Sequence, residues 1–238
     1  MLSVTNLVKT YGKQNAVNDI TFELQGGEVV GLLGPNGAGK STTMKCIVGL
    51  LRKTSGEITL GGYDHLSVNA KRLFSYIPET PYVYDLLTVQ EHMQFVAQAY
   101  GVKDWRGKAD EYLEIFELAD KKDKLGRDLS KGMRQKVSIC CALLPDPKVL
   151  FFDEPMIGLD PKAIKNTKRI FRELKEAGKT ILVSTHLIDG IESIADRVMI
   201  LKDGNIVGND TIANLKQQFV QEEGTSLEDL FLEMTKDV

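Results

Sequence analysis

The clearest chemical signal in the chain is a glycine-rich stretch that ends in lysine and serine. Residues 34–41 read GPNGAGKS and match the phosphate-binding pattern G-x-x-x-x-G-K-[ST] at every fixed position. Residues 28–33 predict a short buried strand before this stretch, and residues 41–50 predict a helix after it. Loop N–H groups and the positive end of a helix both attract phosphate oxygens. The sequence therefore predicts a nucleotide phosphate site rather than an ordinary glycine turn.

Two side chains of this loop could do specific chemistry. Lys40 carries a positive charge that suits the outer phosphates, and the Ser41 hydroxyl can ligate Mg²⁺. The residues expected to contact the nucleotide here are Asn36, Gly37, Ala38, Gly39, Lys40, Ser41 and Thr42.

A second signal is an apolar run that ends in two carboxylates. Residues 148–154 read KVLFFDE, which is typical of a central parallel strand buried on both faces. At the carboxyl end of such a strand, Asp153 would lie near the phosphate loop and hold Mg²⁺ through water. Glu154 could then act as the general base for an attacking water. A strand followed by a solvated acidic turn is the alternative, and the pairing with the loop at Lys40 favours the catalytic interpretation.

A third signal is a helix start at residues 128–136, DLSKGMRQK. Ser130 suits an N-cap, and Val137, Cys140, Cys141 and Leu144 follow at helical spacing. A capped helix start can hold an anion. Taken alone, the segment would be a capped surface helix with a basic first turn.

In this order and spacing, the three signals resemble those of the ATP-binding-cassette (ABC) ATPases, and the resemblance covers nearly the whole chain. Four further segments match: residues 9–12 (KTYG), 76–79 (YIPE), 158–161 (GLDP) and 184–186 (STH). The resemblance implies that Tyr11 stacks on adenine and that Glu79 contacts Mg²⁺ and lies near the membrane partner. It also implies that Asp160 lies at a dimer interface and that His186 is a catalytic residue that senses the γ-phosphate.

Two departures from the family pattern bear on the membrane partner. Lys131 and Met133 replace the usual glycine and glutamine of the signature, whereas Ser130 and Gly132, which meet the second subunit's γ-phosphate in the family, are present. Glu79 stands where glutamine is commonest. These variants make the chain most similar to exporter-type subunits, in particular the Ecs-type bacterial subunits, and less similar to importer subunits.

The resemblance also implies the fold, an α/β P-loop NTPase with a RecA-like core, an antiparallel β subdomain and a helical subdomain. We expect a single domain over residues 1–238, with the core and antiparallel part at about 1–87 and 146–238 and the helical part at about 88–145. From the residues themselves, strands are expected at 2–8 and 16–24, helical structure from 88 to about 125, a helix at 163–177, and a hairpin turn at Asp203-Gly204 between strands 197–201 and 205–207.

The composition of the chain disfavours several other classes of protein. Of 238 residues, 42% are hydrophobic and 26% are charged, which is an ordinary globular balance, and the net charge of −3 disfavours a nucleic-acid partner. No apolar run is long enough to cross a bilayer, and no signal peptide is evident. Cys46, Cys140 and Cys141 lack metal-ligand spacing and are expected to be core residues of a protein in a reducing cytosol.

These features together predict an ATPase that binds ATP and Mg²⁺ and drives a bacterial exporter. The expected partners are a separate integral membrane permease and a second ATPase subunit, in a head-to-tail homodimer on the inner face of the cell membrane. Three alternatives remain: an importer subunit, a soluble ABC ATPase acting on nucleic acid or the ribosome, and a nucleotide-binding regulatory subunit without turnover.

Substitution of Tyr11 tests the adenine assignment directly. Tyr11→Ala should weaken ATP binding by about 1–3 kcal/mol, which is the usual contribution of base stacking on an aromatic ring. Tyr11→Phe keeps the ring and should restore the affinity in calorimetric titrations. Equal affinities for the two variants would make Tyr11 a turn residue only.

Overall fold

The larger of two sheets holds the carboxylates and the phosphate loop. The structure is a computed structural model that describes residues 1–186, 188–219 and 226–236. Its six-stranded sheet has the order β10-β9-β3-β8-β7-β6, in which β9 to β6 run parallel and β10 pairs antiparallel with β9. The strands are β3 (Val29–Leu33), β6 (Phe74–Ile77), β7 (Val149–Asp153), β8 (Thr180–Ser184), β9 (Arg197–Lys202) and β10 (Asn205–Asp210).

The smaller sheet is antiparallel and has the order β2-β1-β4-β5. Its strands are β1 (Leu2–Tyr11), β2 (Gln14–Leu24), β4 (Ser55–Leu60) and β5 (Tyr63–Asp64). The antiparallel sheet expected at the start of the chain is therefore confirmed, and its first two strands extend further toward their shared turn than predicted. The Asp203-Gly204 hairpin is also confirmed, with both residues at positive φ, 48° and 77°.

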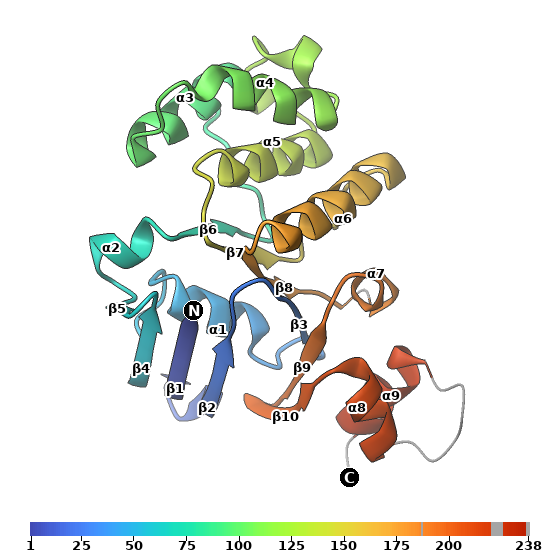
Figure 1. Cartoon of the computed structure of the whole chain (residues 1–238). Helices are drawn as coiled ribbons and strands as arrows, with labels where there is room; N and C mark the ends of the chain where they lie inside the picture. The colour runs from blue at the N-terminus through green and yellow to red at the C-terminus, as the bar shows by residue number, and fades with distance from the viewer. Residues whose placement is uncertain (187, 220–225, 237–238) are drawn as a thin grey trace.

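Alternate side chains of the parallel strands enter two separate cores. In β7, Leu150 and Phe152 pack with the helices on one face, whereas Val149 and Phe151 pack on the other face with the antiparallel sheet. Helix α1 (Lys40–Ile47) lies in this second core, between the two sheets (Figure 1). Burial on both faces explains the uninterrupted apolar run that the sequence shows here.

Three helices lie together beyond the β6 end of the parallel sheet (Figure 1). They are α3 (Val89–Tyr100), α4 (Trp105–Ile115) and α5 (Lys131–Leu143). Short 3₁₀ turns at Ala119–Lys121 and Gly126–Asp128 lie between α4 and α5. The helical stretch expected from 88 to about 125 is thus divided. Gly101 and Asp104 adopt left-handed backbone conformations that end α3 and precede α4.

The remaining helices flank the sheets. They are α2 (Val68–Lys71), α6 (Pro161–Glu176), α7 (Ile188–Glu192), α8 (Ile212–Phe219) and α9 (Leu227–Thr235), of which the last two lie beside β10 (Figure 1). Helix α6 begins two residues before the predicted start because Asp160 caps it and Pro161 occupies its first turn. Within the described ranges, no helix combines the length and the apolar character that crossing a membrane requires.

A buried histidine holds the loop that precedes α3. His92 is 5% exposed; its Nδ1 lies 2.7 Å from the Thr88 carbonyl oxygen, and its Nε2 accepts a hydrogen bond of 2.8 Å from the Tyr84 N–H. Only the neutral ring with a proton on Nδ1 satisfies both contacts. Burial lowers the pKa of His92, against the opposing effects of the Thr88 carbonyl and Glu91.

This arrangement predicts a loss of stability at mildly acidic pH. Below about pH 6.5 the unfolded chain takes up a proton that folded His92 resists, so stability falls as pH drops, by at most about 1.4 kcal/mol per pH unit. His92→Gln should lower the stability at pH 7.5 and flatten its dependence on pH down to 5.5, measured by urea denaturation. A pH dependence parallel to that of the wild-type chain would contradict this role for His92.

Candidate nucleotide-binding site

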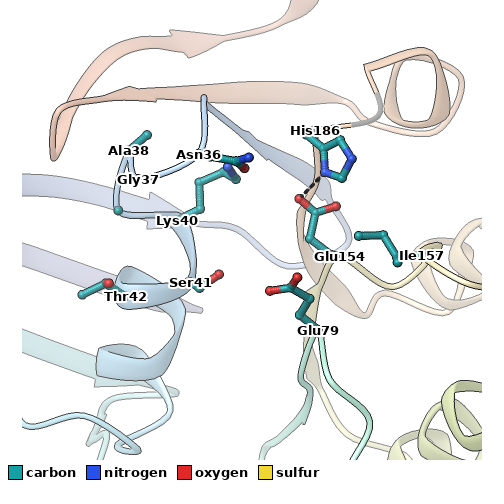
Figure 2. A pocket seen from close by; sticks show the side chains of 11 residues that line it. Asn36, Gly37, Ala38, Lys40, Ser41, Thr42, Glu79, Glu154, Ile157 and His186 are labelled. Atoms are coloured by element: carbon teal, nitrogen blue, oxygen red, sulfur yellow. Dashed lines mark hydrogen bonds and ion pairs between the residues drawn. The ribbon is translucent and has the colours of Figure 1, made fainter. Parts of the chain in front are cut away.

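A pocket of about 370 Å³ opens where the phosphate loop meets the carboxyl ends of β7 and β8. Figure 2 shows Lys40 and Ser41 on one side of it and Glu79, Glu154 and His186 on the other. The lining residues are Asn36, Gly37, Ala38, Gly39, Lys40, Ser41, Thr42, Glu79, Glu154, Ile157 and His186. Segments far apart in the sequence therefore converge as the motifs predict.

The loop conformation depends on glycine at position 39. Gly39 has φ 103°, and a Cβ atom built there would lie 2.3 Å from the carbonyl oxygen of Ala16. No side chain caps the N-terminus of α1. Its positive end thus faces the pocket without a competing side-chain acceptor, as an anion site requires.

Lys40 is the cation of the pocket and is only 8% exposed. Its ammonium donates to the carbonyl oxygens of Gly34 at 2.7 Å and Pro35 at 3.1 Å. Burial lowers the pKa of Lys40, while the nearby carboxylates of Glu154, Asp153 and Glu79 act in the opposite direction. A phosphate group would give this desolvated cation an anionic partner.

Asp153 is the hydrogen-bond acceptor at the centre of the site. Its Oδ1 accepts from the hydroxyls of Ser41 at 3.0 Å and Ser184 at 2.5 Å, and its Oδ2 accepts from Tyr76 at 3.3 Å. Asp153 and Ser184 are register partners of β7 and β8, so the sheet itself sets their approach. Burial, together with the Asp153 carboxylate, raises the pKa of Tyr76 and keeps its hydroxyl a donor.

The donor atoms around Asp153 suit Mg²⁺. Mg²⁺ prefers hydroxyl, carboxylate, water and phosphate oxygens, and it is usually held by one or two carboxylates together with substrate phosphates. Ser41 contacts Asp153, and Glu79 lines the same pocket. No cluster of three or more His, Cys, Asp or Glu residues that could hold a metal occurs among the residues described.

Glu154 is held in a strained conformation that turns its carboxylate toward the pocket. Its φ is +50°, and its N–H donates to the Ser184 carbonyl oxygen at 3.0 Å. Oε1 lies 2.9 Å from Nδ1 of His186. Oε2 is buried and has no hydrogen-bond partner among the described residues. A buried, unpartnered carboxylate oxygen can accept a proton from a bound water.

Four of the predicted nucleotide contacts do not line this pocket: Tyr11, Ser130, Gly132 and Asp160. Tyr11 is 50% exposed, with the Lys9 ammonium 4.7 Å from the centre of its ring. Half of the residue is thus accessible from outside, but Tyr11 lies outside the pocket that holds the phosphate loop.

The other three residues lie where α5 meets the loop after β7. Ser130 caps α5 through Met133 N–H at 3.2 Å. Asp160 caps α6 and pairs with Lys136 at 2.6 Å. The hydrogen bond from Lys136 lowers the pKa of Asp160 most, and the hydrogen bond from the Ala163 N–H lowers it further. Gly132 packs so closely that a Cβ would lie 2.5 Å from the Gly158 carbonyl oxygen.

Sequence reasoning missed three residues of the site. Ser184 and Tyr76 were noted only as members of matching segments, and Ile157 was not noted. The register of parallel strands could have pointed to Ser184, because residues at equivalent ends of neighbouring strands meet at one edge. No pattern indicates Ile157, which enters through the course of the loop after β7.

Comparison with known proteins identifies the family. The profile of the ABC transporter family matches residues 17–157, from β2 through the phosphate loop to the loop after β7. The match covers more than half of the chain, so the chain belongs to the ABC transporter family. Within it, the chain is an ATP-binding subunit, an ATPase that hydrolyses ATP to drive transport.

Two curated relatives from Bacillus subtilis (strain 168) match over most of their length. The ABC-type transporter ATP-binding protein EcsA is 36% identical over 100% of this chain and 97% of its own. The SkfA peptide export ATP-binding protein SkfE is 34% identical over 92% of each chain.

Two solved structures share the fold. The ATP-binding subunit of an ABC transporter superposes with a TM-score of 0.94 at 39% identity, over 99% of this chain and 100% of the other. The ATP-binding cassette MJ0796, solved as a dimer in a post-hydrolysis state with ADP and Pi, gives a TM-score of 0.79 at 27% identity over 89% and 99%. The predicted ABC ATPase fold is confirmed.

Glu154→Gln tests the general base. The amide cannot take a proton from water, so hydrolysis should slow by about 10²–10⁴-fold while ATP binding persists. Steady-state phosphate release and calorimetric ATP binding measure the two effects. Glu57→Gln, a neutralised exposed carboxylate of β4, should change neither. Turnover of Glu154→Gln at the wild-type rate would remove Glu154 from the reaction.

Proposed function

We propose that two copies of this chain clamp ATP head to tail and drive a bacterial exporter through a separate integral membrane permease. The observation that carries the proposal is a divided site. The chain holds a phosphate pocket around Lys40 and, outside that pocket, a capped helix start at Ser130 with the features of a second anion site. A second copy can supply the missing half to each pocket.

Within one pocket, the residues divide the work as follows. Lys40 and the α1 N-terminus hold the phosphates, and Glu154 accepts a proton from the attacking water. Bound Mg²⁺ would offset phosphate charge, and Ser41, Glu79 and Asp153 are the residues that would hold it. His186 fixes one oxygen of Glu154 and leaves the other free.

The second copy would contribute its Ser130 and Gly132. Ser130 is exposed, and the first turn of α5 has no acidic residue, so its N-terminus can face a γ-phosphate. The dimeric MJ0796 cassette with ADP and Pi supports such an assembly. In the free chain, Asp160 pairs with Lys136, a residue of α5. We therefore infer that Asp160 reaches the interface together with α5.

The segment after Glu79 supports contact with a membrane partner. Large apolar side chains are exposed here: Tyr82 (85%), Tyr84 (50%), Leu86 (74%) and, on α3, Phe95 (49%). An apolar group of this kind marks an interaction surface in soluble domains. The proposed permease would cover it and hold the subunit at the inner face of the cell membrane.

Export is favoured over import by two observations. The relative SkfE carries peptide export in its name. Glu79, Lys131 and Met133 also follow the exporter-type variants rather than the commoner family pattern. The net charge of −3 disfavours action on nucleic acid.

Mixed dimers test the head-to-tail arrangement. Ser130→Arg should block closure by adding bulk and charge, and Lys40→Ala should abolish tight ATP binding. If each site takes Lys40 from one chain and Ser130 from the other, a dimer with one variant on each chain places both defects in one site. The other site stays whole, and the mixed dimer should close around one ATP, as measured by light scattering and bound nucleotide.

The reverse arrangement is the control. A chain carrying both substitutions, paired with a wild-type chain, damages both sites in a head-to-tail dimer but spares one site if each is built within a chain. Closure of this second dimer, with failure of the first, would overturn the proposal.

A further inference from the structure

Tyr76 contacts the proposed metal ligand from a neighbouring strand. It lies in β6, the edge strand of the parallel sheet, and its hydroxyl donates to Oδ2 of Asp153 at 3.3 Å. Ser41 and Ser184 both contact the other oxygen, Oδ1. Of these three contacts, the one from Tyr76 acts on Oδ2, and it restrains the rotation of the carboxylate about its last bond.

The strand register places the Tyr76 side chain on the same face of the sheet as Asp153. Tyr76 pairs in register with Phe151, two residues before Asp153, and packs against the core that Phe151 shares with α1.

The chemistry of the Tyr76 contact suits an orienting role. A hydrogen bond to an ionised acceptor is generally stronger than one between neutral groups. Groups that hydrogen-bond to a metal ligand commonly set the affinity of the metal site. The phenol ring is also rigid, and its packing against the core between the two sheets fixes where the hydroxyl lies.

We propose that Tyr76 is a positioning residue that orients Asp153 for the metal and thereby raises the affinity of the site for Mg²⁺. The inference rests on the proposed role of Asp153 as a ligand of Mg²⁺.

Calorimetry can measure the metal contribution without turnover. The affinity of a non-hydrolysable ATP analogue is determined in MgCl₂ and in EDTA, and the ratio of the two reports the contribution of the metal. Tyr76→Phe keeps the ring and removes only the hydroxyl. It should lower this ratio about tenfold, at the lower end of such effects, and leave the affinity in EDTA unchanged.

Asp153→Asn distinguishes a failure of the proposed metal role of Asp153 from a failure of the proposed role of Tyr76. It should lower the ratio at least as much as Tyr76→Phe. If Asp153→Asn leaves the ratio unchanged, the metal role of Asp153 fails, and with it the basis of the inference. If Asp153→Asn lowers the ratio and Tyr76→Phe does not, the proposed function stands and the inference is wrong. Thermal melts confirm that each variant is folded.

Discussion

The carboxylate of Asp153 can organise the site because the strand that carries it is buried on both faces. Leu150 and Phe152 fill one core, and Val149 and Phe151 fill the other. With both faces packed, β7 cannot shift in register without exposing one set of side chains or the other. The end of the strand is fixed in space as a result. Ser184, the register partner of Asp153 on β8, is fixed by the same packing.

The position of α1 follows from the same constraint. Met44 and Ile47 of α1 enter the core that Val149 and Phe151 share with the antiparallel sheet. That packing sets where the helix begins, and Gly39 allows the loop before it to pass against Ala16. The contact of Ser41 with Asp153 is thus the meeting point of two rigid elements. An anion bound at the N-terminus of α1 meets donors that are already oriented, which is how such sites avoid the cost of reorganisation.

Several parts of the site were predictable because their chemistry is local. The phosphate loop is a contiguous pattern, and the pair Asp153-Glu154 ends a recognisable buried strand. By contrast, the contacts of Ser184 and Tyr76 with Asp153 depend on the strand order β8-β7-β6, which no local pattern states. The break between α3 and α4 was also missed, since the apolar spacing continues past Gly101. Helix α6 begins two residues before its predicted start, because capping by Asp160 outweighs the apolar periodicity from which the start was predicted.

The chain combines a strained residue, Glu154, with a nucleotide site that is incomplete within one copy. Glu154 adopts a left-handed backbone conformation, which costs a residue with a side chain about 1–3 kcal/mol. It also buries a carboxylate oxygen that has no hydrogen-bond partner in the described part of the chain. Neither feature stabilises the isolated subunit, so the surrounding packing must offset both. A bound water at Oε2 would relieve the second cost. The free chain therefore favours a water at the position from which it can attack.

The groups at Ser130 that would enclose the phosphate lie outside the same pocket. If, as proposed, enclosure needs a second copy, hydrolysis waits for association although each chain already holds its base. Such a division ties the chemical step to a movement between subunits, and this tie is what a transport motor requires.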